Sequence, residues 1–237
     1  MRASKNVLIC GVTSKIGYQL AWRHCEMGDQ VYGLDAMKLE SLKELTEQYP
    51  NLRVFKCDVR YNIAVDQALS LLTTNFEKVN IIYYAENNII ESQRGLALAE
   101  LDVDGAKKMM DINAFGMLRL CKGLWDKIWE DSLVVAISDY AGSIGAARQG
   151  DSYGYAMSKA ALNMATKLLS NELWQRNARA ICIAPGPVRP EGLLIPVEGP
   201  TIKVEESVAG IFDIVEKIQE IPRDQLFVDY QGHVLAW

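Results

Sequence analysis

The 237-residue sequence is poor in the residues that build metal centres and disulfide frameworks. It has two histidines, His24 and His233, and neither lies beside an acidic residue at metal-ligand spacing, so we expect no metal site. Its five cysteines are scattered along the chain, and no Cys-x-x-Cys pair exists. The odd count and the spacing argue against disulfides and a zinc site, and they predict small buried thiols instead.

An excess of positive charge and a long apolar run are also missing. The formal net charge is −5 and the pI is near 5.2, so the chain has no basic footprint for nucleic acid. No apolar stretch reaches the roughly 20 residues that a membrane span needs. The N-terminal stretch MRASKNVLIC runs directly into an expected strand and has no signal-peptide core. We therefore expect a cytoplasmic protein that binds neither nucleic acid nor membrane.

Strand-like and helix-like patterns alternate from one end of the chain to the other. Several expected strands are near-continuous apolar runs, such as Leu133–Ile137, which is typical of strands buried on both faces of a parallel sheet. We predict an α/β fold with one domain over residues 1–237, a doubly wound parallel sheet of about seven strands and helices on both faces. The expected strands are Asn6–Cys10, Gln30–Asp35, Leu52–Cys57, Asn80–Tyr84, Ser132–Ser138, Ala178–Ala184 and Leu226–Asp229, and the expected helices are about 16–27, 39–49, 62–76, 103–129, 153–176 and 204–219.

The stretch CGVTSKIG follows the first expected strand and opens a helical pattern. Gly11 ends the strand, Gly17 lies in the first helical turn, and Thr13 and Ser14 add hydroxyl groups near the helix N-terminus, where N–H groups and the dipole favour a phosphate. A glycine after a strand is often only a turn, so Asp35 strengthens the prediction. It ends the second strand, where a carboxylate accepts hydrogen bonds from an adenosine ribose and repels a 2′-phosphate. The pattern predicts a dinucleotide site that prefers NAD to NADP.

The stretch Tyr155-Ala-Met-Ser-Lys159 opens a long helical pattern between two expected strands. A spacing of four residues puts Tyr155 and Lys159 on one face of the helix. A nearby ammonium favours phenolate and lowers the pKa of a tyrosine, which suits the phenol for proton exchange with an alcohol or carbonyl oxygen. A Tyr-x-x-x-Lys pattern occurs often by chance. Its place after a strand that ends near Ser138 is what supports the prediction of an acid/base site.

Together these motifs resemble those of the short-chain dehydrogenase/reductase family, over nearly the whole chain. The resemblance implies a divergent member with an NAD(P)-binding Rossmann fold that moves a hydride between NAD(H) and a small alcohol or carbonyl substrate. It also implies assembly as a homodimer or homotetramer. The segments that carry it, besides those above, are Met110–Gly116, Asp58-Val59, Ala184–Gly186 and Phe227–Gly232.

The resemblance implies roles for individual residues. Tyr155 would be the general acid/base, Lys159 would hold the nicotinamide ribose and tune Tyr155, and Asn113 would support a proton-relay water. A short substrate lid is expected at about residues 189–203. Contacts to the cofactor are expected from Gly11, Thr13, Ser14, Lys15, Ile16, Gly17, Asp35, Asp58, Val59, Ala85, Glu86, Tyr155, Lys159, Pro185, Gly186 and Val188.

Four residues depart from the family pattern, and all four fall in the expected cofactor or substrate pocket. Lys15 and Glu86 replace glycines, Asp139 replaces the catalytic serine, and Pro190 replaces a threonine that usually holds the carboxamide. We expect Lys15 and Glu86 to pair across the groove, or else to point to solvent at its rim. These departures support an alternative hypothesis, a non-catalytic member that uses the fold for binding, regulation or assembly.

The change at Asp139 is the most serious one for catalysis. A serine hydroxyl donates to the substrate oxygen as negative charge develops, and an ionised carboxylate cannot. Losing one such donor costs about 3 kcal/mol, or two orders of magnitude in rate. Three alternatives stay open: Ser138 substitutes if the strand end twists, Ser143 in the following loop substitutes, or a protonated Asp139 donates.

Overall fold

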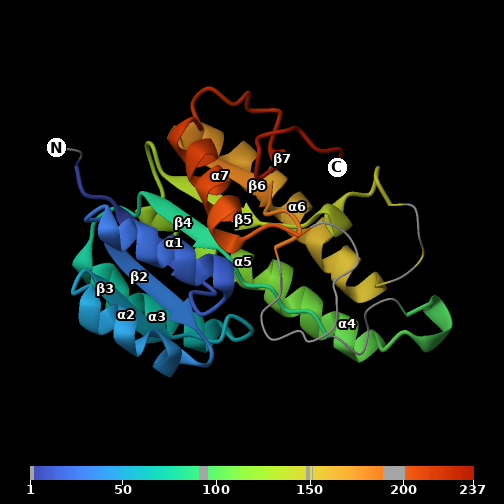
Figure 1. The fold of residues 1–237 in the computed structure, drawn as a ribbon, viewed down its shortest axis with the longest axis horizontal. Coiled ribbons are helices and arrows are strands. Elements are labelled where there is room, and N and C mark those ends of the chain that lie inside the picture. Colours follow the sequence, from blue (N-terminus) through green and yellow to red (C-terminus); the bar gives the residue numbers. More distant parts are fainter. Residues whose placement is uncertain (1–2, 91–95, 148–149, 151, 189–200) are drawn as a thin grey trace.

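The computed structural model describes residues 3–90, 96–147, 150, 152–188 and 201–237. Seven parallel strands form one sheet in the order β3-β2-β1-β4-β5-β6-β7 (Figure 1). This sheet confirms the predicted α/β fold class. The strands are β1 (Asn6–Cys10), β2 (Gln30–Asp35), β3 (Leu52–Lys56), β4 (Ile81–Tyr84), β5 (Leu133–Ile137), β6 (Arg179–Ala184) and β7 (Phe227–Asp229).

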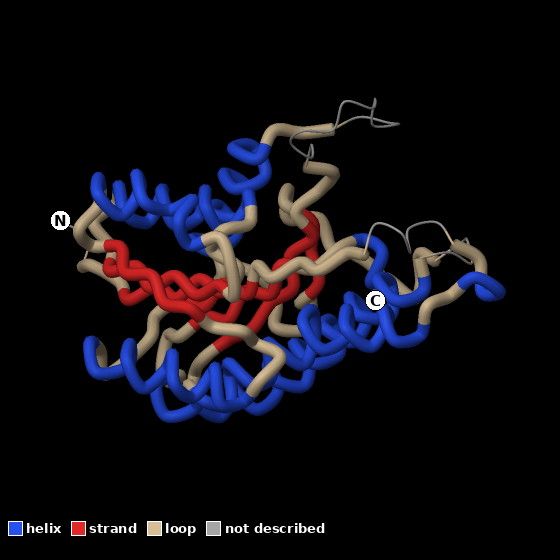
Figure 2. The backbone as a smooth tube through the Cα atoms, turned by 90° about the horizontal axis from the view of Figure 1, so that it is seen from below, coloured by secondary structure: helices blue, strands red, loops and turns tan. Residues whose placement is uncertain are grey.

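Helices cover both faces of the sheet (Figure 2). Two separate apolar clusters lie between the sheet and these helical layers. One layer contains α1 (Lys15–Glu26), α2 (Lys43–Gln48) and α7 (Val204–Glu216), and the other contains α3 (Asn62–Leu72), α4 (Val103–Met110), α5 (Gly116–Gly123) and α6 (Tyr153–Leu173).

Alternate residues of β1 serve the two faces of the sheet. Leu8 and Cys10 pack in the cluster under α3, α5 and α6, whereas Val7 and Ile9 pack in the cluster under α1 and α7. All four side chains are fully buried, and a strand buried on both faces needs apolar residues at every position. For the same reason the predicted strand bounds agree with the structure to within one residue at each end.

The predicted helix over residues 103–129 is interrupted, because a π-helical segment, Asp111–Phe115, separates α4 from α5. Side chains bind the carbonyls of this segment: the Tyr84 hydroxyl donates to the Ile112 carbonyl. A Cβ at Gly116 would lie 2.2 Å from the Tyr84 oxygen, so glycine makes room for this contact. The backbone bonds here take the wider π spacing, as in the bond from the Gly116 N–H to the Asp111 carbonyl.

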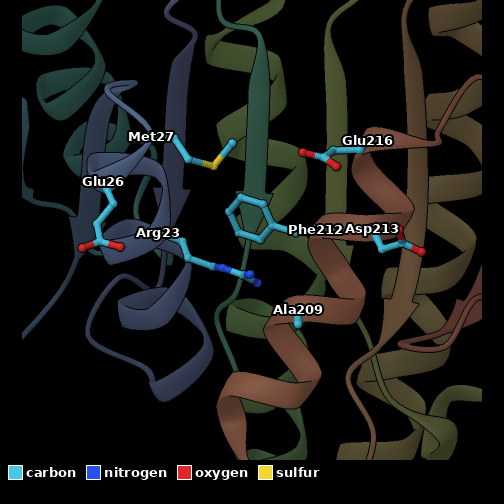
Figure 3. A pocket seen from close by; sticks show the side chains of 7 residues that line it. All are labelled: Arg23, Glu26, Met27, Ala209, Phe212, Asp213 and Glu216. Atoms are coloured by element: carbon cyan, nitrogen blue, oxygen red, sulfur yellow. The ribbon is translucent and has the colours of Figure 1, made fainter. Parts of the chain in front are cut away.

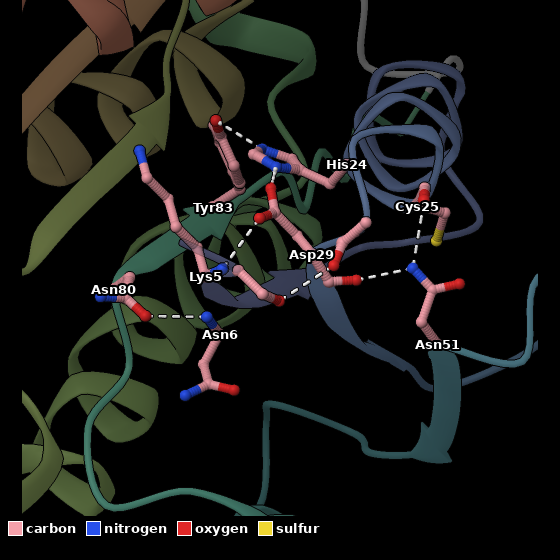
Figure 4. A network of polar contacts seen from close by, with 10 residues as sticks. Lys5, Asn6, His24, Cys25, Asp29, Asn51, Asn80 and Tyr83 are labelled. Atoms are coloured by element: carbon pink, nitrogen blue, oxygen red, sulfur yellow. Dashed lines mark hydrogen bonds and ion pairs between the residues drawn. The ribbon is translucent and has the colours of Figure 1, made fainter. Parts of the chain in front are cut away.

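A buried polar network fixes the C-terminal half of α1 to the sheet (Figure 4). His24 Nδ1 lies 2.7 Å from Asp29 Oδ2, and its Nε2 lies 3.1 Å from the Tyr83 hydroxyl. Asp29 also accepts from the backbone N–H of Lys5 at 2.8 Å. Because these polar groups are buried, their mutual bonds remove the cost of desolvating them.

The expected substrate lid and the expected cytoplasmic location are not tested by this architecture. Residues 189–200, which make up most of the expected lid and include Pro190, lie outside the described residues. Within the described ranges, no helix combines the length and apolarity that crossing a membrane requires. The cytoplasmic location stays a prediction.

Candidate active site

The expected site residues gather at the edge of the sheet where the parallel strands end. Strand order reverses between β1 and β4, and in doubly wound sheets ligands bind beyond the carboxyl ends of the strands at such a point. Gly11 follows β1, Ala85 and Glu86 follow β4, and Tyr155 lies in the first turn of α6. The fold therefore brings both halves of the predicted site to one edge.

The turn between β1 and α1 is closed by two glycines. Gly11 has a φ of 82°, and a Cβ there would lie 2.6 Å from the Ala85 carbonyl carbon. A Cβ at Gly17 would lie 2.1 Å from the Gly11 oxygen. Ser14 caps α1 by accepting from the Gly17 N–H at 3.0 Å. Lys15 is the first residue of α1, and the helix N-terminus therefore faces the reversal point.

Asp35 ends β2 and is held by the same turn. Its Oδ2 accepts from the Thr13 hydroxyl at 2.7 Å and from the Thr13 N–H at 3.2 Å. Its Oδ1 accepts from the Met37 N–H at 3.2 Å. Ile16, the second residue of α1, packs against the apolar cluster under that helix. The carboxylate is therefore fixed beside the phosphate turn, where the sequence places the adenosine ribose.

The expected ion pair between Lys15 and Glu86 stays a prediction. The Glu86 side chain is turned onto β1, and its Oε1 lies 3.8 Å from the Cys10 sulfur. Burial is the main reason that the pKa of Glu86 is raised to about 7, and the carboxylates of Asp35 and Asp58 raise it further. Within the described residues the Cys10 thiol is the one hydrogen-bond partner of this carboxyl, and with a pKa of about 7 the group is partly protonated at neutral pH.

Asp58 and Val59 follow β3 on the nucleotide side of the site. Arg60 Nη2 lies 2.6 Å from Asp58 Oδ2, and the hydrogen bonds from Arg60 lower the pKa of Asp58. Val59 is buried, and its carbonyl accepts from Arg119 at 3.0 Å. Sequence reasoning missed Arg60, although its place two residues after Asp58 was a usable signal.

The catalytic half is built around one face of α6. The Tyr155 hydroxyl lies 2.9 Å from Asp139 Oδ2 and 3.1 Å from Asn87 Oδ1. The Lys159 ammonium lies 5.7 Å from the centre of the Tyr155 ring and donates to the Ile137 carbonyl at 3.1 Å. Burial lowers the pKa of Lys159 to about 8. The predicted Tyr155–Lys159 face thus meets the end of β5.

The structure does not bring Ser138 or Ser143 to Tyr155. The Ser138 hydroxyl donates to Asn163, and the Ser143 hydroxyl donates to the carbonyl of Ala236 at 2.7 Å. Successive residues at a strand end point to opposite sides, so Asp139 faces Tyr155 and its neighbour does not. In this arrangement both serine hydroxyls are engaged elsewhere, and a role for either in place of the missing hydroxyl stays a prediction.

Asn113 lies in the π-helical segment and is fully buried. Its Nδ2 donates to the Asn88 carbonyl at 2.8 Å and to Ser158 Oγ at 2.9 Å. Its Oδ1 accepts from the Asn88 N–H at 2.7 Å. The amide thus clamps the segment after β4 against α6. The relay water expected at Asn113 stays a prediction.

The segment after β6 forms a turn that closes against α7. Gly186 has a φ of 76°, and the Pro185 carbonyl accepts from the Ser207 hydroxyl at 2.6 Å. Val188 pairs with Ile202 in a short parallel bridge. These contacts fix the described residues Pro185 and Val188 against α7 and Ile202.

A separate hollow of about 500 Å³ lies between α1 and α7 (Figure 3). The Arg23 guanidinium lies 4.9 Å from the centre of the Phe212 ring across it. Since these residues belong to the second half of α1 and to α7, the hollow includes none of the predicted site residues. It is lined by Arg23, Glu26, Met27, Ala209, Phe212, Asp213 and Glu216.

Comparison with known proteins agrees with this geometry. A family model described as enoyl-(acyl carrier protein) reductase matches residues 11–194. The chain belongs to the short-chain dehydrogenase/reductase family. It is 30% identical over 155 residues to the C-signal protein of Myxococcus xanthus, covering 64% of this chain and 90% of that protein. It is 28% identical over 186 residues to L-fucose dehydrogenase of Oryctolagus cuniculus, covering 78% of this chain and 63% of that protein.

Solved structures of this family share the fold at low sequence identity. The NADPH-bound carbonyl reductase from chicken fatty liver has a TM-score of 0.86 at 19% identity, with 100% of both chains covered. The carbonyl reductase Sniffer of D. melanogaster has a TM-score of 0.83 at 21% identity, with 99% of this chain and 100% of that chain covered. These neighbours establish the fold, and the chemistry of this chain depends on its own residues.

Proposed function

We propose that the chain is an oxidoreductase that transfers a hydride between NAD(H) and an alcohol or carbonyl substrate, with Tyr155 as the general acid/base. The observation that carries this proposal is the position of Tyr155 at the end of β5, with the buried ammonium of Lys159 lying 5.7 Å from the centre of its ring. A phenol so placed can exchange a proton with a substrate oxygen, and a nearby cation favours its phenolate form.

The residues around the reversal point fit a dinucleotide. The capped N-terminus of α1, with Lys15 as its first residue, would receive the pyrophosphate. Asp35 would accept the adenosine ribose hydroxyls, and its charge supports a preference for NAD over NADP. Lys159 would bind the nicotinamide ribose. The remaining contacts would come from Gly11, Thr13, Ser14, Ile16, Gly17, Asp58, Val59, Ala85, Glu86, Pro185, Gly186 and Val188.

The chemistry divides between the cofactor and the chain. The bound nicotinamide would supply or accept the hydride. Tyr155 would give its proton to the substrate oxygen during carbonyl reduction and would take a proton during alcohol oxidation. Lys159 would hold positive charge beside the phenol throughout, which lowers the cost of forming the phenolate.

We also propose that the protein assembles as a homodimer or homotetramer. The support is an apolar face on α6 and the neighbouring π-helical segment, where Met157 is 55%, Met164 60%, Leu168 56% and Phe115 49% exposed. Side chains at this helical spacing form one stripe, and a second copy related by a two-fold axis would cover it. Light scattering on wild type and Met164→Glu tests this: the substitution should yield a smaller species, and an unchanged mass would contradict the interface.

A thermal-shift titration with NAD, NADH, NADP and NADPH tests the proposed cofactor. A ligand at 100 times its dissociation constant stabilises a protein by about 2.7 kcal/mol, which is easily measured. We expect the two NAD forms to raise the melting temperature at lower concentrations than the two NADP forms. No shift with any of the four at millimolar concentration would favour the non-catalytic alternative.

A further inference from the structure

The surroundings of the Tyr155 hydroxyl differ from those expected in the family. Two described side chains contact its oxygen, Asp139 at 2.9 Å and Asn87 at 3.1 Å. Both oxygens of Asp139 accept hydrogen bonds here, from the Tyr155 hydroxyl and the Ala141 N–H, whereas an amide both donates and accepts. Of these two neighbours, Asn87 is therefore the one that carries N–H donors.

The single hydroxyl proton of Tyr155 decides whether the oxygen or the nitrogen of the Asn87 amide faces it. The phenol has one proton, and the Asp139 carboxylate is the stronger acceptor and the nearer one. Once that proton points to Asp139, an amide oxygen 3.1 Å away would meet lone pairs, whereas an amide N–H would meet an acceptor. The oxygen and nitrogen of an amide are told apart by their hydrogen bonds, which here favour the nitrogen facing Tyr155.

The position of Asn87 is fixed from both sides although its side chain is exposed. Glu86 before it is turned onto Cys10, and Asn88 after it is clamped through its backbone by Asn113. Within the described ranges, the side chain of Asn87 forms no hydrogen bond besides the one at Tyr155. Its amide is thus held at the phenol and still has a second N–H to offer.

We propose that Asn87 is a catalytic residue that donates an N–H hydrogen bond to the substrate oxygen, in place of the family's serine hydroxyl. This rests on the proposed function, because a substrate oxygen that exchanges a proton with Tyr155 must lie within hydrogen-bond distance of its hydroxyl. Asn87, already 3.1 Å from that hydroxyl, reaches the same place.

The hydrogen bond from Asn87 needs no proton beyond the one that Tyr155 transfers. During carbonyl reduction the hydride forms a bond to the carbon, the C=O π electrons move to oxygen, and the Tyr155 proton is transferred to that oxygen. Asn87 donates a hydrogen bond and transfers nothing. Asp139 loses its partner at that moment and keeps its hydrogen bond from the Ala141 N–H at 2.9 Å.

The test compares Asn87→Ala in two backgrounds, wild type and Asp139→Ser, with NADH and a panel of aliphatic and aromatic aldehydes and ketones. Asn88→Ala is the matched control, because Asn113 binds the backbone of Asn88 and that contact survives the substitution. NADH affinity and melting temperature are measured for each variant.

In the wild-type background, we expect Asn87→Ala to lower kcat about 100-fold while Asn88→Ala stays within about threefold. In the Asp139→Ser background the introduced hydroxyl supplies a donor, so Asn87→Ala should cost less than about tenfold. NADH affinity should not change.

Equal losses in both backgrounds, or a loss below about threefold in wild type, would overturn the role of Asn87 and leave the proposed function standing. Turnover absent from wild type and from Asp139→Ser, although NADH binds, would overturn the proposed function and the role of Asn87 together.

Discussion

The two ends of the site each carry a carboxylate where the family has a small residue, Glu86 at the nucleotide end and Asp139 at the catalytic end. Asp139 accepts hydrogen bonds from the Tyr155 hydroxyl and the Ala141 N–H, at 2.9 Å each. Glu86 has only the Cys10 thiol, at 3.8 Å, within the described part of the chain. The same substitution of an acid for a small residue therefore produces different chemistry at the two ends.

The difference shows that the surroundings decide what an introduced acid does: burial is the main cause of the raised pKa of Glu86, and neighbouring carboxylates add to it. Where donors converge, the carboxylate is satisfied and becomes part of the hydrogen-bond arrangement around Tyr155. Where an apolar strand and other carboxylates converge, the pKa rises to about 7 and the group becomes sensitive to pH. Three predictions distinguish the nucleotide end from the catalytic end by experiment.

Tyr155→Phe should have the largest effect and should act at the catalytic end alone. Removing the general acid/base should lower kcat by about 10³-fold, while NADH affinity stays within about twofold. Steady-state kinetics and calorimetric titration with NADH measure the two quantities. Turnover close to that of wild type would refute the assignment of Tyr155.

Glu86→Gln should stabilise the protein at pH 7.5. The pKa of Glu86 is about 7 in the folded protein against a usual value of 4.5, so the folded state holds a proton that the unfolded state releases. The free energy of unfolding therefore falls as pH rises from about 4.5 to 7. Because the side chain is partly exposed, we expect a gain of about 2 kcal/mol at pH 7.5 and little change at pH 4.5.

Urea denaturation at both pH values measures this gain. Asp139→Asn is the matched control, and it should give no stabilisation because the native carboxylate already has two donors. An equal change in the free energy of unfolding for Glu86→Gln and Asp139→Asn would contradict the distinction between the nucleotide end and the catalytic end.

The smallest expected effect is on the pH dependence of NADH affinity, which should depend on Glu86 and not on Asp139. Ionised Glu86, beside Asp35 and Asp58, would repel the cofactor phosphates, and Lys159 is the cation that opposes this charge. With a pKa of about 7, the protonated fraction drops about fourfold between pH 6 and 7.5. The dissociation constant should rise by that factor in wild type and in Asp139→Asn, and should stay flat in Glu86→Gln. A flat wild-type profile would contradict the effect of Glu86.

The fold and the Tyr155–Lys159 face could be predicted because they depend on local periodicity. The direction of a side chain just past a strand end does not depend on local periodicity. The sequence therefore could not predict that the Glu86 side chain turns onto Cys10. Asn87 meets Tyr155 from 68 positions away, a contact that only the assembled sheet creates. The break in the helix over residues 103–129 has the same origin, because Tyr84 of β4 binds the carbonyl of Ile112.

The transfer of deuterium from NADH labelled at nicotinamide C4 tests the central claim most directly. The labelled cofactor is incubated with the panel of aldehydes and ketones and either wild type or Tyr155→Phe. With wild type we expect an alcohol that carries deuterium on its carbinol carbon, and with Tyr155→Phe at most a trace of it. Unlabelled products throughout, from a protein that binds NADH, would contradict it.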